Sequence, residues 1–233
     1  MSGPRMKAMI LAAGRGERMR PLTDKLPKAL LAVGGKPLIA WHVEKLVAAG
    51  FVEIVINHAH LGALIEAALG SGPQFGANII YSAETQALET AGGIANALHL
   101  LGDAPFAVVN ADVFSDFDYR GLAGSVARLA APDVLAHLIL VANPEHHAGG
   151  DFALRAGRVA LDGERHTFSG IAAYRPALFQ ALVPGSSAKL APLLREQIAA
   201  QRVSGELFEG LWHDIGTPAR LASLERELAT RWQ

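Results

Sequence analysis

The sequence contains no cysteine, few aromatic residues and no long apolar run. Without cysteine there can be no disulfide bonds, thiolate nucleophiles or cysteine-based zinc sites. No run reaches the roughly 18 apolar residues that a membrane-spanning helix needs. The N-terminal segment 1–7 is polar, and the apolar run after it leads directly into arginines, which is unlike a signal peptide. We therefore expect a soluble, cytoplasmic protein that does not bind membranes.

An excess of charge of one sign is also missing. The 21 lysines and arginines nearly balance the 22 aspartates and glutamates, and the net charge is −1. No basic stripe stands out, so we do not expect nucleic acid as a partner, and any anion must be bound by a local cluster. Hydrophobic residues make up 51% of the chain and charged residues 18%, which excludes a disordered protein. The 233 residues suffice for one hydrophobic core, and we predict a single domain, 1–233.

The pattern of apolar residues predicts an α/β fold. Strands are predicted at residues 9–12, 52–57, 78–81, 106–110 and 136–141, and shorter ones at 152–154, 159–161 and 169–174. Helices are predicted at 37–49 with Pro37 at the first helical position, at 90–100 with Thr90 as the cap, and at 60–69, 190–200 and 218–231. This alternation favours a Rossmann-like, mostly parallel sheet flanked by helices, with a smaller second layer after residue 141. Ligands should bind beyond the carboxyl ends of the strands.

A loop rich in glycine and arginine leaves the first predicted strand. Gly14 and Gly16 allow backbone N–H groups to approach a phosphate chain closely. Arg15, Arg18 and Arg20 add positive charge, and Lys28 follows a few residues later. The loop is not a dinucleotide fingerprint, because Met19 stands where a third glycine is needed, and no G-x-x-x-x-G-K-[ST] motif occurs. The other interpretation is an ordinary tight turn with solvated arginines.

The run G-x-G-x-R-M-x-P-L-T, followed by P-K, resembles the signature of the sugar-1-phosphate nucleotidyltransferase family. That family joins a sugar phosphate to a nucleoside triphosphate and releases pyrophosphate. The resemblance implies the nucleotide-diphospho-sugar transferase fold, with a nucleotide-binding half at about 1–141 and a sugar-binding half at about 142–233. It also implies that Arg18 stabilises the leaving pyrophosphate and that Lys28 bridges phosphates of the two substrates. The residues implied to wrap the triphosphate are Ala12, Ala13, Gly14, Arg15 and Gly16.

Two aspartates are the candidate metal ligands. Asp112 follows the strand predicted at 106–110, and Asp214 lies in a D-x-G-T run just before a predicted helix. Taken alone, an aspartate before a helix is usually a cap, and the sequence does not show that the two residues meet. The resemblance implies that both bind one Mg²⁺. Two carboxylates suffice, because Mg²⁺ usually keeps water and phosphate oxygens as further ligands.

The resemblance also implies contacts to the base and to the sugar. Glu84 and Gly92 match the base-binding segment, although a solvated surface role for Glu84 is equally consistent with the residues. Glu89 stands where many relatives have glycine. The residues that match the sugar pocket are Asn110, Asp151, Glu164 and Gly170. Many relatives carry a Glu-Lys pair whose lysine binds the sugar phosphate, and its nearest match here is Glu164-Arg165, which leaves that second phosphate contact open.

The nine histidines raise the question of a zinc site, above all His146-His147. Adjacent histidines on an extended chain point to opposite sides, and no companion spacing supports a metal site, so we expect solvated or core roles for them.

Within the family, the segments Leu-Glu-Thr-Ala-Gly-Gly, Asn-Pro-Glu-His-His and Gly-Gly-Asp-Phe resemble the uridylyltransferases that act on N-acetylmuramate 1-phosphate in cell-wall recycling. Mannose- or heptose-1-phosphate guanylyltransferases are the alternative. No acetyltransferase repeat is present, so the bifunctional N-acetylglucosamine-phosphate type is not expected. A non-catalytic nucleotide-sugar sensor is the alternative from another class, and a Rossmann oxidoreductase is disfavoured by Met19. The expected partners are a nucleoside triphosphate and a sugar 1-phosphate, and the protein is expected to be a monomer or a small homo-oligomer.

Overall fold

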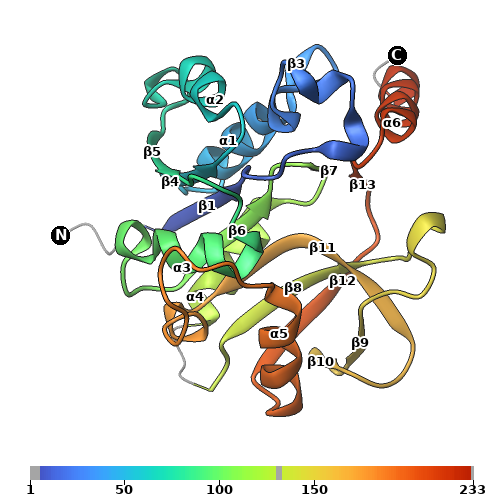
Figure 1. Cartoon of the computed structure of the whole chain (residues 1–233). Helices are drawn as coiled ribbons and strands as arrows, with labels where there is room; N and C mark the ends of the chain where they lie inside the picture. The colour runs from blue at the N-terminus through green and yellow to red at the C-terminus, as the bar shows by residue number, and fades with distance from the viewer. Residues whose placement is uncertain (1–5, 130–132, 232–233) are drawn as a thin grey trace.

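The computed structural model describes residues 6–129 and 133–231, so most of the polar N-terminal segment, residues 1–5, lies outside it. Within the described part, nine strands form one sheet in the order β5-β4-β1-β6-β11-β8-β12-β10-β9 (Figure 1). These strands are β1 Lys7–Leu11, β4 Glu53–His58, β5 Asn78–Ala83, β6 Phe106–Asn110, β8 Ala136–Val141, β9 Phe152–Arg155, β10 Arg158–Ala160, β11 Arg165–Tyr174 and β12 Val203–Phe208. Two short ribbons pair β2 (Ala32–Val33) with β3 (Lys36–Pro37), and β7 (Val113–Ser115) with β13 (Trp212–Asp214).

The first half of the sheet is a parallel block. Strands β5, β4, β1 and β6 run in the same direction, with Leu11 of β1 opposite Asn57 of β4 and Asn110 of β6. Strand β11 enters antiparallel between β6 and β8, and β12 lies parallel to β8. The chain leaves β1 toward β4 on one side and returns as β6 on the other. The gap between β1 and β6 is therefore the switch point at which open α/β sheets bind ligands.

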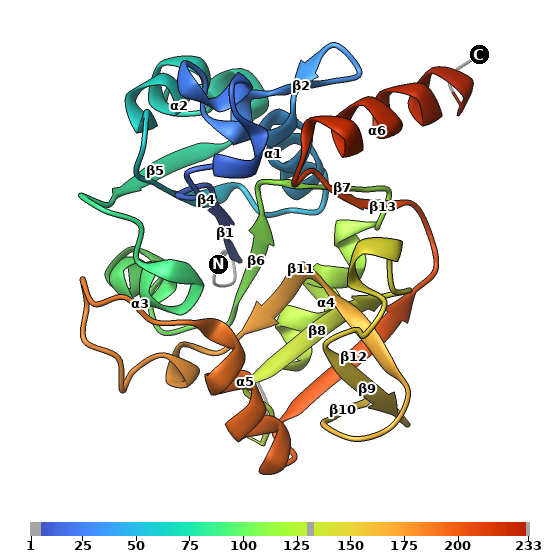
Figure 2. The ribbon, with the colours of Figure 1, turned by 45° about the vertical axis from the view of Figure 1, so that its right-hand side comes forward.

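Helices cover both faces of the sheet, as Figures 1 and 2 show. Helices α1 (Leu38–Ala48), α2 (Gly62–Leu69) and α4 (Tyr119–Arg128) share one core with the side chains of Ala8 and Ile10. Helices α3 (Glu89–Leu101) and α5 (Leu190–Ala199) share the other core with Met9. Alternate residues of β1 thus face opposite layers, as the two-residue period of a strand requires. No helix among the described residues is long and apolar enough to span a membrane.

Helix α6 (Pro218–Arg231) lies apart from these layers, beside β2 and β13 (Figure 2). Leu224 and Leu228 on its inner face are buried against Met19 of the loop that follows β1, Val33 of β2 and Ile215 just after β13. Burial of an aliphatic side chain of this size contributes about 1.5–3 kcal/mol. The core of α6 therefore fixes the position of the glycine-arginine loop relative to β13.

Most predicted elements are present with shifted ends. The predicted strand 169–174 is the second half of the longer β11, and the strand predicted at 9–12 begins earlier, at Lys7. Two predictions about helix starts were wrong: Pro37 is the residue before α1, and Thr90 lies inside α3, whose cap position is Leu88. Elements β7, β12, β13 and α4 were not predicted. The strands β7 and β13 are three residues each, too short to show a period.

Candidate active site

A cavity of about 330 Å³ opens at the switch point. Its walls come from the loop after β1, from the ends of β4 and β6, and from the start of α3. The lining residues are Leu11, Ala12, Ala13, Gly14, Lys28, Ala29, Asn57, Ala87, Glu89, Thr90, Asn110, Ala111 and Asp112. We call it the first cavity. Ala12, Ala13, Gly14 and Lys28, which sequence analysis proposed as phosphate-binding, line it together with Asp112.

The loop after β1 is held by its own backbone and by β4. The N–H of Ala12 donates to the side-chain oxygen of Asn57 at 3.0 Å. Gly16 has φ +69°, and the hydroxyl of Thr23 donates to its carbonyl oxygen at 2.7 Å. A Cβ at Gly14 would meet nothing within 4 Å, so this backbone is open toward the first cavity. Arg15 lines neither the first cavity nor the second cavity described below. Its guanidinium instead donates to the Thr23 carbonyl at 3.1 Å.

Glu84 and Gly92 lie behind the first cavity and do not line it. The buried carboxylate of Glu84 accepts from the Asn57 side chain at 2.7 Å and from the Leu88 N–H at 3.0 Å. Gly92 packs against the segment before α5, where a Cβ would lie 2.9 Å from the Ala188 nitrogen. Glu89 does line the cavity, in a left-handed conformation with φ +60°. Since few residues other than glycine adopt this conformation, Glu89 is a strained residue at the cavity wall.

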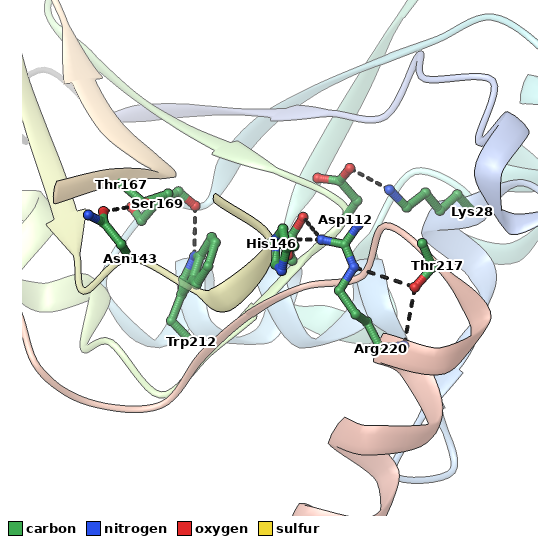
Figure 3. A network of polar contacts seen from close by, with 10 residues as sticks. Lys28, Asp112, Asn143, His146, Thr167, Ser169, Trp212, Thr217 and Arg220 are labelled. Carbon is green, nitrogen blue, oxygen red and sulfur yellow. Dashed lines mark hydrogen bonds and ion pairs between the residues drawn. The ribbon is translucent and has the colours of Figure 1, made fainter. Parts of the chain in front are cut away.

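A second cavity of about 350 Å³ shares Asn110 and Asp112 with the first. Besides these two residues it is lined by Arg18, Val113, Pro144, His146, His147, Thr167, Phe168, Ser169, Gly170, Trp212 and Asp214. Gly170 sits at φ +79°, where a Cβ would lie 2.6 Å from the Asn110 amide nitrogen. Glycine at this position therefore allows the Asn110 side chain to lie against β11. The indole N–H of Trp212 donates to the Ser169 carbonyl at 2.9 Å (Figure 3).

The two candidate metal ligands come together in this wall. Strands β7 and β13 pair so that Asp214 lies opposite Val113, and the N–H of Ile215 donates to the Asp112 carbonyl at 2.7 Å. Asp214 is thus the last residue of a strand and does not cap α6. No group of three or more His, Asp or Glu side chains able to hold a metal occurs in residues 6–129 and 133–231. Two carboxylates fit an ion that completes its coordination with phosphate and water oxygens.

Each of the two carboxylates is paired with a cation. The ammonium of Lys28 donates to Oδ2 of Asp112 at 2.6 Å, and the guanidinium of Arg220 donates to Oδ2 of Asp214. Figure 3 shows Lys28 pointing toward Asp112, and Arg220 reaching from α6 toward His146. Arg220 was not proposed from the sequence. A signal existed, because an arginine in the first turn of a helix opposes the helix dipole unless it has an anionic partner.

The two histidines of the pair are solvated, as we expected, with side chains 41% and 42% exposed, but they also contact two carboxylates. Both residues lie in the 3-10 turn Glu145–His147 and line the second cavity. Nε2 of His146 is 3.0 Å from Asp214, and Nε2 of His147 is 3.1 Å from Asp151. Asp151 also accepts from the Phe168 N–H at 2.8 Å. The structure therefore places Asp151 behind His147.

Asp151 and Glu164 do not line the second cavity. Glu164 is exposed in the turn between β10 and β11. Asp151 contacts the lining residue His147, whereas Glu164 is not among the residues that line either cavity. The sequence predicted that both residues belong to one sugar pocket. In the structure, Asp151 is next to that cavity through its contact with His147, and Glu164 lies outside it.

Buried side chains from α1 hold β7 from behind. Nε2 of His42 donates to the Val113 carbonyl at 2.7 Å, so Nδ1 accepts from the Tyr119 hydroxyl at 2.8 Å. Burial lowers the pKa of His42 from 6.5 to about 4, which keeps the imidazole neutral. The Lys45 ammonium donates to the carbonyls of Ser115 and Phe117, and burial lowers its pKa. These bonds fix the strand that begins directly after Asp112.

Known proteins resemble this chain over nearly its whole length. Residues 7–150 match the family model described as nucleotidyl transferase. A Neisseria meningitidis protein named N-acetylmuramate alpha-1-phosphate uridylyltransferase is 54% identical, over 98% of this chain and 100% of its own. A Caulobacter vibrioides protein of the same name is 37% identical, over 95% and 96%. A mannose-1-phosphate guanyltransferase of Aspergillus fumigatus is 32% identical, over 91% of this chain and 61% of its own.

Among solved structures, a Bacillus anthracis protein described as a candidate glucose-1-phosphate thymidylyltransferase superposes with a TM-score of 0.84. The match covers 95% of this chain and 94% of that one, at 22% sequence identity. At this identity the similarity concerns the fold alone. It agrees with the α/β architecture described above.

Proposed function

Because this chain belongs to the nucleotidyl transferase family, we propose that it is the enzyme that transfers a uridylyl group from UTP to N-acetylmuramate 1-phosphate and releases pyrophosphate. The high identity to the Neisseria protein over that protein's full length supports the choice of substrates. Mannose- or heptose-1-phosphate guanylyl transfer is the second candidate, supported by the more distant guanyltransferase. The non-catalytic sensor has little support, because Arg18, Lys28, Asp112 and Asp214 are all present.

One observation carries the proposal: the two cavities meet at Asn110 and Asp112. A reaction between two bound anions requires neighbouring sites with positive charge where they touch. The first cavity has Lys28 and the second has Arg18, on either side of that shared wall. We assign the first cavity to the nucleoside triphosphate and the second to the sugar 1-phosphate, with one domain divided at about residue 141.

The loop after β1 is the proposed triphosphate site. The backbone of Ala12, Ala13 and Gly14 lines the first cavity, and N–H groups that face a cavity can donate to phosphate oxygens. Gly16 and Arg15 act by shaping this loop through their bonds to Thr23. Glu84 supports the base-binding wall by holding the Asn57 side chain and the Leu88 N–H.

In the second cavity, we propose that Asn110 and the backbone at Gly170 bind the sugar. The close approach of the Asn110 amide to Gly170 fixes the amide in the cavity wall, where it can bond hydroxyl groups. Asp151 would act by orienting His147, which lines the same cavity. Glu164 contributes nothing to this arrangement.

Asp112 and Asp214 would hold a divalent metal, which we propose is Mg²⁺. The fit rests on the donor set: two carboxylates, partly exposed at 42% and 27%, whose backbones are joined by the Ile215 N–H. Hard oxygen ligands suit Mg²⁺. When bound, the ion supplies Lewis-acid charge that neutralises phosphate oxygens.

The reaction would be a direct displacement at the α-phosphorus. A sugar-phosphate oxygen forms the new P–O bond as the bond to pyrophosphate breaks, and the attacking oxygen is already anionic at neutral pH, so no general base is needed. The contribution of the protein is to hold both anions in neighbouring cavities and to meet the developing charge with Arg18 and Lys28.

The test is to measure pyrophosphate release in the presence of Mg²⁺ for every pair of one nucleotide and one sugar phosphate. The nucleotides are UTP, GTP, dTTP and CTP, and the sugar phosphates are the 1-phosphates of N-acetylmuramate, glucosamine, mannose, heptose and glucose. Release with UTP and N-acetylmuramate 1-phosphate alone is the expected result. Release with GTP and a mannose or heptose phosphate would replace our first candidate by the second. If folded protein releases no pyrophosphate with any pair, the non-catalytic sensor would be favoured.

We further propose that the protein is a cytoplasmic monomer or small homo-oligomer that binds neither nucleic acid nor membranes.

A further inference from the structure

Lys28 and Arg220 stand in the same relation to the two carboxylates of the site. Lys28 is paired with Asp112, and Arg220 with Asp214. The family resemblance implies that Lys28 binds phosphate, but it assigns nothing to Arg220. We propose that Arg220 is the cation that binds the phosphate of the sugar 1-phosphate, and that Asp214 holds it in place until substrate and metal bind. This inference rests on the proposed function and deepens it.

Arg220 does not itself line the second cavity, but its guanidinium contacts two residues that do, His146 and Asp214. Thr217 caps α6, because its hydroxyl accepts from the backbone N–H of Arg220 at 3.3 Å, and the same oxygen lies 3.4 Å from Nε of Arg220. Gly216 leaves the room that the side chain needs, since a Cβ there would lie 2.8 Å from Cζ of Arg220. The run Gly216-Thr217-Pro218 therefore both starts the helix and sets the direction of the arginine.

His146 supports this orientation. Its Nε2 is 2.6 Å from Nη1 of Arg220 and 3.0 Å from Oδ1 of Asp214. Both contacts cannot be hydrogen bonds, because a guanidinium only donates and one ring nitrogen cannot accept and donate together. The shorter contact is the one to the guanidinium, so we take Nε2 as the acceptor from Arg220. His146 lines the second cavity, and its contact with Arg220 places the guanidinium next to a lining residue. Figure 3 shows this contact.

Charge balance then points to phosphate as the partner. The Arg220 side chain is only 20% exposed and stands at the positive end of α6, so it needs an anion nearby. At present that anion is Asp214. A divalent cation held by the two carboxylates would compete with Lys28 and Arg220 for them, and the phosphates of the substrates would then be the anions available to both cations. Arginine suits a phosphate because it can donate two parallel hydrogen bonds.

The sequence offers one competing residue, Arg165, next to Glu164. Its guanidinium donates to the Leu161 carbonyl at 3.3 Å, and the side chain is exposed outside both cavities. Arg18 does line the second cavity, but the resemblance implies a role for it on the pyrophosphate. Unlike Arg165, Arg220 contacts two lining residues of the second cavity, His146 and Asp214, and we therefore assign it the position of the second phosphate-binding lysine.

The test compares steady-state kinetics of Arg220→Ala with the wild-type enzyme. Losing a charge-assisted bond of this kind should raise KM for the sugar 1-phosphate by roughly ten- to a hundredfold and leave KM for the nucleotide within about twofold. Arg220→Lys should recover part of the loss. Gly216→Ala, which displaces the guanidinium, should act in the same direction as Arg220→Ala. The exposed Arg226 on the same helix gives the matched control, Arg226→Ala, with no change. Thermal unfolding checks that each variant is folded.

A second measurement separates substrate binding from simple support of Asp214. Mn²⁺ binding without substrates, followed by electron paramagnetic resonance, should be as tight or tighter in Arg220→Ala, because Arg220 competes with the metal for Asp214. Weaker Mn²⁺ binding, or an equal rise in KM for both substrates, would show that Arg220 only positions Asp214. A rise in the sugar-phosphate KM of Arg165→Ala, with none in Arg220→Ala, would assign the phosphate contact to Arg165. Inactivity of the wild-type enzyme with every substrate pair would instead refute the proposed function itself.

Discussion

The backbone N–H of Ile215 donates a 2.7 Å hydrogen bond to the carbonyl of Asp112, and this bond joins the two halves of the site. It continues the pairing of β13 with β7, so Asp214 and Asp112 share one small ribbon although they are far apart in the sequence. The ribbon is outside the main sheet. Its position depends on α1, through His42 and Lys45, and on α6, through the core around Ile215.

The first prediction concerns the two carboxylates. Asp112→Asn and Asp214→Asn should each lower Mg²⁺-dependent turnover by about 100- to 1,000-fold or more, because charge stabilisation of the transferred phosphate is lost. Pyrophosphate release at saturating substrates is the measurement, with circular dichroism to confirm folding. Asp116→Asn, in the exposed turn after β7, is the control. Full activity of either variant of Asp112 or Asp214 would remove that residue from the metal site.

Substitutions of the two glycines in the loop after β1 should have different effects, one on stability and the other on nucleotide binding. Gly16→Ala should lower the free energy of unfolding by about 1–2 kcal/mol, since φ is +69° and the new Cβ would lie 3.0 Å from Thr23. Gly14→Ala should leave stability unchanged, because the Cβ meets nothing, while its methyl group weakens nucleotide binding in the first cavity. Urea unfolding and nucleotide KM are measured for both. A large loss of stability in Gly14→Ala would contradict the open loop described here.

A substitution of Gly92 tests whether this residue serves packing or base recognition. Gly92→Ala should destabilise the fold by about 1–3 kcal/mol, because its Cβ would press on the backbone at Ser186 and Ala188. The nucleotide KM of the folded fraction should change little. If the variant has an unchanged melting temperature and a raised nucleotide KM, the result would support the direct contact between Gly92 and the base that the sequence predicted.

Stability should fall in mild acid because of His42. Burial lowers its pKa from 6.5 to about 4, so between these values the unfolded chain binds more protons than the folded protein. The free energy of unfolding should therefore decrease as the pH falls from about 6.5 to 4, by up to about 3 kcal/mol from this residue. His137, whose pKa burial also lowers to about 4, acts in the same direction.

Urea unfolding between pH 7 and 5 measures this effect. His42→Gln, which keeps a donor for the Val113 carbonyl, should show a shallower pH dependence than the wild-type protein. An identical slope in both proteins would mean that folding does not lower the pKa of His42.

The sequence predicted the parallel block and the phosphate loop because both are local. The strand at Phe106–Asn110 and the loop at Gly14 and Gly16 carry their signals within a few residues. The meeting of Asp112 with Asp214 could not be derived from the residues, since it depends on a three-residue pairing across the fold. Family resemblance alone had placed them at one metal, and the structure brings them into one wall.

For other site residues the structure shows contacts inside the protein that the sequence does not reveal. Glu84 and Arg15 look available in the sequence, yet each bonds neighbouring backbone. Arg220 and the histidine pair were missed for the opposite reason. A basic residue in a helical first turn and two histidines in a loop look like solvated surface until the contact with Asp214 is seen.

The core shared by Met19, Leu31, Leu224 and Leu228 has a consequence for how the enzyme is made. The glycine-arginine loop leaves the ribosome before α6, which follows it far along the chain. Until Leu224 and Leu228 emerge, the loop lacks the partner that closes its core, and Asp112 lacks the strand that brings Asp214. A nascent chain can therefore build the parallel block before α6 emerges, but it cannot acquire the wall with both aspartates until α6 has been synthesised.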